Sequence, residues 1–300
     1  MTSLSRNDWT LLVLLTLCWG INWPIMKIGV QDFPPMTFRA LCMIGGLPAL
    51  WLIARIQGAS LAIPEGQGKT IIRLAIPNMV IWHLCAILGV KMLSSGRAAI
   101  LGYTMPIWAV LCGLIFFGER VTRLAWLGIG FALAGALLLL SSELATLSGQ
   151  PLGSLLILIA AACWGYGTVI MKRIHVEMPT IALTFWMLAF AALIVAGASI
   201  LFERAAWRLP TPTEWMAIVY NALIIFGFAH VVWFKLARTL PPVASSLSVM
   251  MIPVLGVFSG AWLLGETPHW QDYAAMALIL AAMSTVLLKP RTLVPLESNI

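Results

Sequence analysis

Charged residues are scarce in this sequence. Lys, Arg, Asp and Glu together make up 10% of its 300 residues, whereas 61% are apolar. A soluble globular domain carries roughly 25% charged residues, so this composition excludes that class and predicts an integral membrane protein. The net charge of +7 would favour nucleic-acid binding in a soluble protein, but the cations occur singly or in pairs between apolar runs. We therefore expect no nucleic-acid partner and interpret these cations as topology signals.

The sequence also lacks the patterns of metal sites, cofactor sites and common enzymes. Its five cysteines lie within apolar runs and form no Cys-x-x-Cys pair, which favours helix packing over disulfides or metal ligands. Gly-x-Ser-x-Gly, His-Glu-x-x-His and Gly-x4-Gly-Lys-Ser/Thr are all absent. We expect no metal, no cofactor and no enzymatic activity. An intramembrane enzyme or a channel is the alternative from a different class.

Ten apolar runs are long enough to cross about 30 Å of hydrocarbon at about 1.5 Å per residue. The first run is too long for a signal peptide, so we expect it to be retained as a span. No loop between the runs is long enough to hold a soluble domain. The sequence thus predicts an all-α membrane protein with ten transmembrane helices at approximately residues 9–29, 35–56, 70–92, 95–117, 121–141, 152–174, 180–202, 214–237, 241–264 and 269–288.

The distribution of basic residues predicts the orientation of the chain. If the N-terminus is cytoplasmic, most of the 18 Lys and Arg residues fall on the cytoplasmic side. Cytoplasmic loops carry an excess of such residues, so we expect both termini in the cytoplasm. The expected surroundings are the lipid of the cell (inner) membrane, crossed many times, and we expect a monomer.

Two motifs occur twice in the chain. A Cys-Trp-Gly triplet in the first span returns 145 residues later in the sixth, and a Pro-x11-Gly-Glu pattern in the fourth span returns 147 residues later in the ninth. The chain is therefore a tandem duplication, with repeats predicted at residues 8–141 and 150–289. The motif residues are Cys18-Trp19-Gly20 and Cys163-Trp164-Gly165, and Pro106 with Gly118-Glu119 and Pro253 with Gly265-Glu266.

Each predicted repeat contains five spans, which is an odd number. The second repeat must then enter the membrane from the opposite side to the first. Such inverted repeats are typical of alternating-access transporters, whose substrate site lies at the repeat interface near the bilayer midplane.

The repeated motifs resemble those of the EamA-type branch of the drug/metabolite transporter superfamily. The resemblance rests on Trp-Gly early in each first helix and Pro-x11-Gly-Glu closing each fourth, and it covers residues 8–289 approximately. It implies a ten-helix carrier of a family in which many members export amino acids and other metabolites. The aromatic crowding is similar to that of the YddG amino-acid exporters.

We therefore expect a secondary transporter that exports small metabolites, amino acids above all, with aromatic amino acids as a candidate. The expected partner is a small-molecule substrate in a central cavity between the repeats. The alternative is a proton-coupled exporter of cationic or aromatic drugs, because aromatic walls accept cations, drugs and amino acids alike.

Polar and aromatic residues inside the spans are the candidates for this cavity, because polar groups are costly in lipid and tend to face a cavity or another helix. Trp19 and Trp164 are related by the repeat, as are His83 and His230, which are 147 residues apart. Each of them could instead serve helix packing. The predicted substrate-binding residues are Trp19, Asn22, Trp23, Asn78, Trp82, His83, Tyr103, Trp164, Thr168, His230 and Ser248.

Prolines and carboxylates bear on the transport mechanism. Pro106 and Pro253 lie about halfway along the fourth and ninth spans, and we predict hinges there. Asp32, Glu119 and Glu266 all lie at span ends, where the two glutamates are expected to bond helix ends or basic loop residues. Proton- and sodium-coupled carriers usually need a membrane-embedded Asp or Glu. Although histidine can titrate in its place, uncoupled facilitation is favoured.

Overall fold

The computed structural model describes residues 6–145, 149–233 and 242–287, with side chains left out at positions 6, 8, 242–248 and 287. The regular secondary structure within these ranges is helical. This confirms the predicted all-α fold. The elements are α1 (Arg6–Val30), α2 (Pro35–Ile56), α3 (Gly68–Ala75), η1 (Ile76–Ile81), α4 (Trp82–Met92), α5 (Ser95–Gly102), α6 (Met105–Phe117), α7 (Arg123–Ala145), α8 (Pro151–Arg173), α9 (Thr180–Phe202), η2 (Arg204–Ala206), α10 (Pro212–Val219), η3 (Tyr220–Ala229), α12 (Pro242–Leu264) and α13 (Trp270–Leu287).

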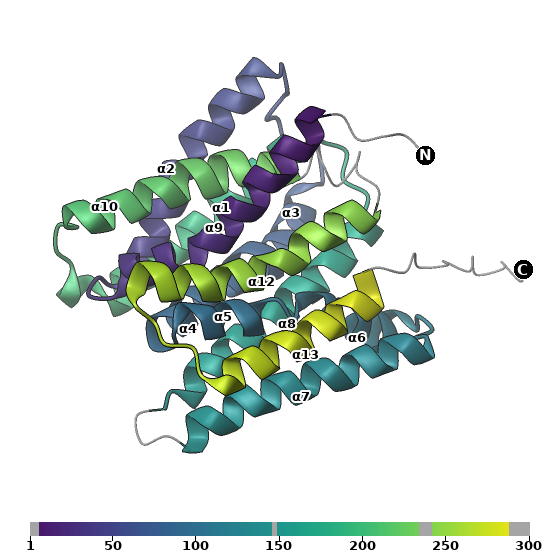
Figure 1. Ribbon diagram of the computed structural model, residues 1–300. Coiled ribbons are helices and arrows are strands. Elements are labelled where there is room, and N and C mark those ends of the chain that lie inside the picture. Colours follow the sequence, from purple (N-terminus) through teal and green to yellow (C-terminus); the bar gives the residue numbers. More distant parts are fainter. Residues whose placement is uncertain (1–5, 146–148, 234–241, 288–300) are drawn as a thin grey trace, which may run out of the picture.

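Eight helical stretches within the described ranges are long and apolar enough to cross a membrane, and they match the first eight predicted spans. A shorter apolar stretch, Val249–Leu264, lies in α12 at the place of the ninth, and α13 lies at the place of the tenth. The start of α1 and the end of α13 lie at the same end of the bundle (Figure 1). The count of ten spans and the cytoplasmic location of the termini stay predictions.

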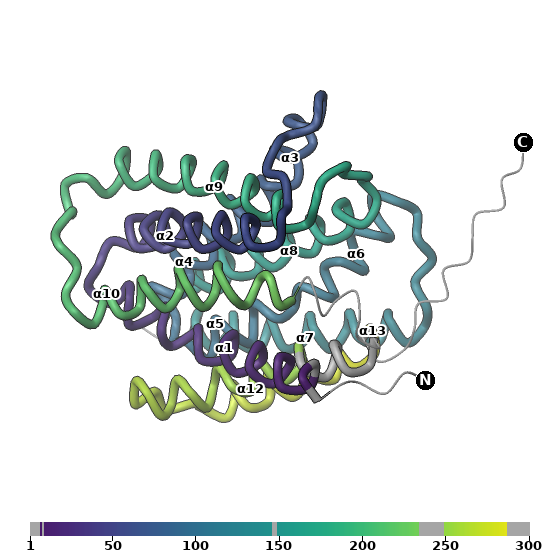
Figure 2. The backbone as a smooth tube through the Cα atoms, turned by 90° about the horizontal axis from the view of Figure 1, so that it is seen from above, coloured from purple at the N-terminus to yellow at the C-terminus, as the bar shows by residue number. Residues whose placement is uncertain are grey.

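The two halves of the chain pack in matching ways. Helix α1 packs on α12, as α8 packs on α6, and α1 contacts α10 and η3, as α8 contacts α3 and η1. Two further pairs join corresponding helices of the two halves, α2 with α9 and α7 with α13. Figure 1 shows α7 and α13 side by side at one edge, and Figure 2 shows α2 beside α9. Exchanging the halves leaves this set of contacts unchanged, as expected for a repeat related by a pseudo-two-fold axis.

The repeated Cys-Trp-Gly motif lies at two of these crossings, where the helices approach closely. A Cβ atom on Gly165 of α8 would lie 2.7 Å from the backbone nitrogen of Ala109 and 2.9 Å from the carbonyl oxygen of Met105, both in α6. A Cβ atom on Gly20 of α1 would overlap the Cβ of Leu255 in α12. Glycine lets helix backbones approach closely in a membrane, where packing drives association. The motif therefore has a structural role in joining the first helix of one half to the fourth helix of the other.

Three spans are interrupted or kinked. Both η1 and η3 are π-helices, and they lie at related places in the third and eighth spans. The fourth span is divided, because α5 ends at Gly102 and α6 begins at Met105, immediately before Pro106. Helix α12 instead continues through Pro253. The two prolines thus differ in their local structure, and their predicted hinge role is not tested by it.

Candidate substrate cavity

A cavity of about 150 Å³ lies among α1, α2, α4, α8, η3, α12 and the break between α5 and α6. Its lining includes eight of the residues that the sequence singles out as substrate-binding candidates: Trp19, Asn22, Trp23, Trp82, His83, Tyr103, Trp164 and His230. The remaining lining residues are Met26, Arg39, Ala86, Met105, Ile225, Trp233 and Val249. Both halves of the chain therefore contribute to one space.

Aromatic rings from the two halves contact each other around this space. The rings of Trp82 and Trp164 lie 5.2 Å apart and are tilted at 56°. On the other side, Trp19 lies 5.4 Å from Trp233 and 6.2 Å from His230. These distances and angles are within the range of favourable aromatic pairs. The walls are thus built from rigid side chains that present both apolar faces and polar edges.

Phe226 of η3 separates the two cavity histidines. Its ring lies 5.2 Å from the ring of His83 and 5.5 Å from that of His230, on which it stacks at 18°. His230 Nδ1 lies 2.7 Å from the carbonyl oxygen of Ile225. Because a carbonyl cannot donate, this nitrogen carries the proton and donates it. His83 Nε2 is buried and has no partner within the described part of the chain.

Arg39 is a lining residue that the sequence analysis did not select. It lies in α2, is 1% exposed and is the largest fully buried side chain described. Its Nη2 lies 2.7 Å from Met26 Sδ, and its Nη1 lies 3.4 Å from Asn221 Oδ1. No carboxylate lines the described part of the cavity. The signal available in the sequence was a lone cation inside a span, which by itself indicates a functional site.

Two sequence candidates, Asn78 and Thr168, are absent from this lining. Asn78 donates from Nδ2 to the Leu74 carbonyl at 2.9 Å and packs directly against Gly167 of α8. Thr168 donates from Oγ1 to the Trp164 carbonyl at 2.9 Å, one turn earlier in its own helix. The side chain of Ser248 lies outside the described residues. The geometry of Asn78 and Thr168 is that of packing residues which satisfy their polar groups locally.

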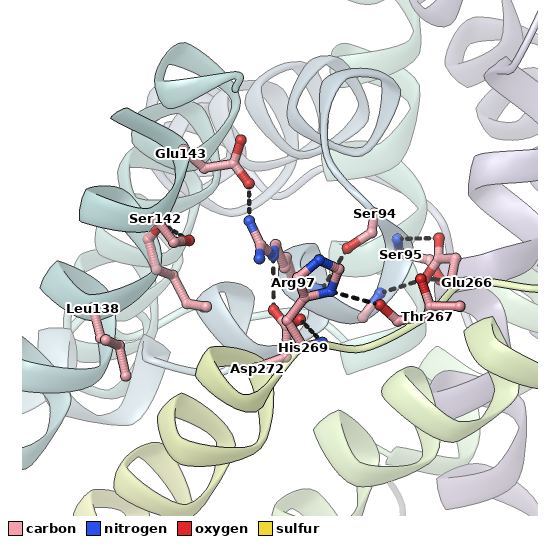
Figure 3. Close-up of polar contacts among 12 residues, drawn as sticks. Ser94, Ser95, Arg97, Leu138, Ser142, Glu143, Glu266, Thr267, His269 and Asp272 are labelled. Carbon is pink, nitrogen blue, oxygen red and sulfur yellow. Dashed lines mark hydrogen bonds and ion pairs between the residues drawn. The ribbon is translucent and has the colours of Figure 1, made fainter. Parts of the chain in front are cut away.

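Polar contacts join the helices at the end of the bundle where α12 turns into α13. Glu266 Oε1 accepts from the Ser95 backbone N–H at 2.7 Å, and Oε2 accepts from Ser95 Oγ at 2.9 Å. Arg97 pairs with Asp272 of α13, Nε to Oδ1 at 2.7 Å, and with Glu143 of α7 (Figure 3). We call Ser95, Arg97, Glu143, Glu266 and Asp272 the polar end network. A hollow of about 440 Å³ lies against it, but Arg97 there is already paired with Glu143 and Asp272, and Glu266 is bonded to Ser95.

The polar end network bears on the predicted roles of the two repeated glutamates. Glu266 binds the first residues of α5, which confirms the expectation that it bonds a helix end. Its repeat counterpart Glu119 accepts from Nη2 of Arg173, the last residue of α8, at 2.5 Å.

Lys27 and Lys91 add contacts between α1 and α4. Lys27 Nζ donates to the Lys91 carbonyl at 2.8 Å, and Lys91 Nζ donates to the Val30 carbonyl at 2.7 Å.

Comparison with known proteins places the chain among membrane transporters. The model of the EamA-like transporter family matches residues 9–141 and 151–288. The chain is 29% identical over 253 residues to the uncharacterized transporter YoaV of Bacillus subtilis, covering 84% of this chain and 86% of that one. It is 29% identical to the uncharacterized inner membrane transporter YedA of Escherichia coli over 285 residues, covering 92% and 89%.

Another relative is a probable amino-acid metabolite efflux pump of Salmonella typhimurium. The two chains are 28% identical over 293 residues, covering 93% of this chain and 94% of the relative. A crystal structure of a protein 22% identical in sequence has the same fold, with a TM-score of 0.68 and coverage of 95% of this chain and 99% of that one.

Proposed function

Because this chain belongs to the EamA-like transporter family and is a multi-pass inner-membrane protein, we propose that it exports small metabolites, amino acids above all, by alternating access through the central cavity. The main support is the cavity itself, in which aromatic residues of both halves surround a few buried polar groups. A relative named a probable amino-acid metabolite efflux pump supports the same substrate class.

The size of the cavity favours a small metabolite over a drug. Its volume is about 150 Å³, and a cavity of about that volume accepts a molecule the size of benzene. Pockets for drug-sized ligands have volumes of roughly 300 to 1,000 Å³. The buried cation Arg39 in the lining also opposes a cationic drug. A single amino acid fits both observations better than a drug-sized cation.

The paired packing of the two halves supports alternating access. An inverted repeat lets the two ends of a carrier exchange roles, because each half can adopt the conformation of the other. At one end of the bundle, Glu266 joins the turn after α12 to the start of α5, and Lys27 and Lys91 join α1 to α4. We propose that these contacts hold that end together while substrate exchanges at the other, with the termini in the cytoplasm. The finer similarity to the YddG exporters stays a prediction.

Transport without ion coupling can be tested in proteoliposomes. We expect saturable counterflow of labelled phenylalanine with no proton or sodium gradient, at rates that change little between pH 5.5 and 8. The reason is that no carboxylate lines the described cavity to carry a proton or ligate a cation. Liposomes without protein are the control. Uptake that never saturates would indicate a channel, and uptake that requires a proton gradient would indicate coupling through His83 or His230.

Replacing His83, one of the two histidines that line the cavity, should lower the affinity for substrate. His83→Ala removes a buried hydrogen-bonding group whose Nε2 is free for a ligand, and such a bond contributes about 0.5 to 1.5 kcal/mol. Phenylalanine affinity in the counterflow assay should fall about two- to twelve-fold. Thr168→Val is the matched control, because the Thr168 hydroxyl is bonded within its own helix. Equal losses in the two variants would show that His83 acts through packing.

A further inference from the structure

Among the residues that the structure describes, Arg39 is a buried charge without a buried counter-charge. Its side chain is 1% exposed, and its Nη2 contacts a thioether sulfur, which is a weak acceptor. Its Nη1 lies 3.4 Å from Asn221 Oδ1, which is long for a hydrogen bond, and its Nε has no partner among the described residues. A buried ion with so little compensation carries a large desolvation cost. A ligand that supplied an anion would offset this cost.

Unpartnered buried groups gather at the same cavity. Six described side-chain atoms are buried without a hydrogen-bond partner, and three of them belong to lining residues: Asn22 Oδ1, Arg39 Nε and His83 Nε2. Buried polar atoms are normally paired, so each exception requires an explanation. Here the three exceptions belong to residues of α1, α2 and α4 that line one small space. This arrangement is that of a binding site with its polar contacts prepared.

We infer that Arg39 binds the carboxylate of the transported substrate. A guanidinium matches a carboxylate with two parallel N–H···O bonds, which a lysine cannot reproduce. The rings of Phe38 and Phe226 lie 5.9 Å and 6.0 Å from the guanidinium carbon, at the outer limit of a cation–π contact. No acidic residue in the described lining competes for it. The inference rests on the proposed function and narrows it to substrates that carry an oxyanion.

The other unpartnered groups complete the fit to an amino acid. Asn22 Oδ1 is an acceptor suited to the substrate ammonium group, while the tryptophans take the side chain. This assignment of contacts predicts which charged group of the substrate contributes more to affinity. Both partners are charged in the anion contact, whereas only the substrate is charged in the ammonium contact, so the carboxylate should contribute more to affinity than the ammonium group.

Binding of three matched molecules tests this directly in purified protein. Phenylalanine, 3-phenylpropionate (no ammonium) and phenethylamine (no carboxylate) are titrated while the melting temperature is followed. We expect both carboxylates to stabilise the wild type and phenethylamine to have little effect. In Arg39→Gln the apparent Kd of both carboxylates should rise roughly 10- to 150-fold, the loss of a hydrogen bond to a charged group. Arg55→Gln is the control, since it removes another cation of α2 that does not line the cavity, and it should bind like the wild type.

A second variant separates a binding role from a packing role. Arg39→Met keeps much of the side-chain volume and removes the unpaired charge, so the ligand-free protein should be at least as stable as the wild type while it fails to bind carboxylates. A structural arginine would behave in the opposite way, with Arg39→Met unstable and Arg39→Gln binding normally. Stabilisation by none of the carboxylates, or equal stabilisation by phenethylamine, would also overturn the inference.

These binding measurements do not depend on transport. If counterflow fails but carboxylate binding depends on Arg39, the anion site stands and the proposed transport of amino acids falls. If phenylalanine counterflow is normal in Arg39→Gln, with unchanged KM, the anion site falls and the transporter stands.

Discussion

Replacing Arg97 by Gln will lower the free energy of unfolding by about 3 to 5 kcal/mol, the usual effect of removing one partner from a buried ion pair. Arg97 is the only cation of the polar end network, and its side chain is 15% exposed. The carboxylates that it pairs with are 10% exposed in Glu143 and 7% exposed in Asp272. Without Arg97 these two acids lose their counter-charge and keep only backbone N–H donors among the described residues, from Gln150 and His269, and α5, α7 and α13 lose their common contact (Figure 3).

Reversible unfolding in mixed detergent micelles measures this loss. Arg173→Gln is the control, because its pair with Glu119 is far more exposed, at 41% and 21%, and should contribute about 1 kcal/mol or less. Adding Asp272→Asn to Arg97→Gln should restore part of the stability, since one unpaired charge disappears. A similar loss in the two arginine variants would show that the Arg97 pairs are energetically like surface pairs.

Placing alanine at Gly165 should cost about 1 to 3 kcal/mol of stability, in the range of an overpacked core, and should abolish most transport. The new Cβ would press on the backbone of α6 at Ala109 and Met105. No change of rotamer relieves a contact with backbone, so α8 and α6 must move apart. Trp164 and Met105 both line the cavity at this crossing, and the walls would shift with the helices.

Gly197 provides the matched control for this substitution. It also lies inside a helix, α9, but a Cβ there would meet nothing within 4 Å. Gly197→Ala should therefore leave transport unchanged and stabilise the helix by about 0.5 to 1 kcal/mol. Gly20→Ala, at the repeat-related crossing, should resemble Gly165→Ala because the Cβ of Leu255 is equally fixed. Normal transport in both Gly165→Ala and Gly20→Ala would contradict this account of the repeated motif.

The internal repeat made much of the fold and cavity predictable. The repeat relates Trp19 to Trp164 and His83 to His230 in the sequence, and all four residues line the cavity. Polar residues inside apolar spans added Asn22 and Tyr103. Repeat-related positions in the sequence can predict cavity residues because symmetry-related residues in an inverted repeat lie near the same axis.

Other features could not be obtained in the same way. Asn78 and Thr168 are polar residues inside spans, like Asn22, but they satisfy their side chains within their own helices. Helical periodicity gives the angle between two residues and does not give the rotation of the helix against its neighbours. Arg39 could not be assigned for a different reason, since a lone cation in a membrane protein can be a topology signal as well as a functional group.

The π-helices η1 and η3 change which residues of the third and eighth spans can face lipid. Hydrogen bonds from i to i+5 place one additional residue in a turn, as a single-residue insertion in an α-helix would. Side chains after the insertion are rotated about 100° from the positions that an uninterrupted α-helix would give them. Across Gly68–Met92, the side facing lipid therefore follows two separate stripes offset at Ile76–Ile81, rather than one. Trp82 and His83 point inward because of that offset. Their orientation therefore depends on the number of residues before them in the span as well as on the residue types.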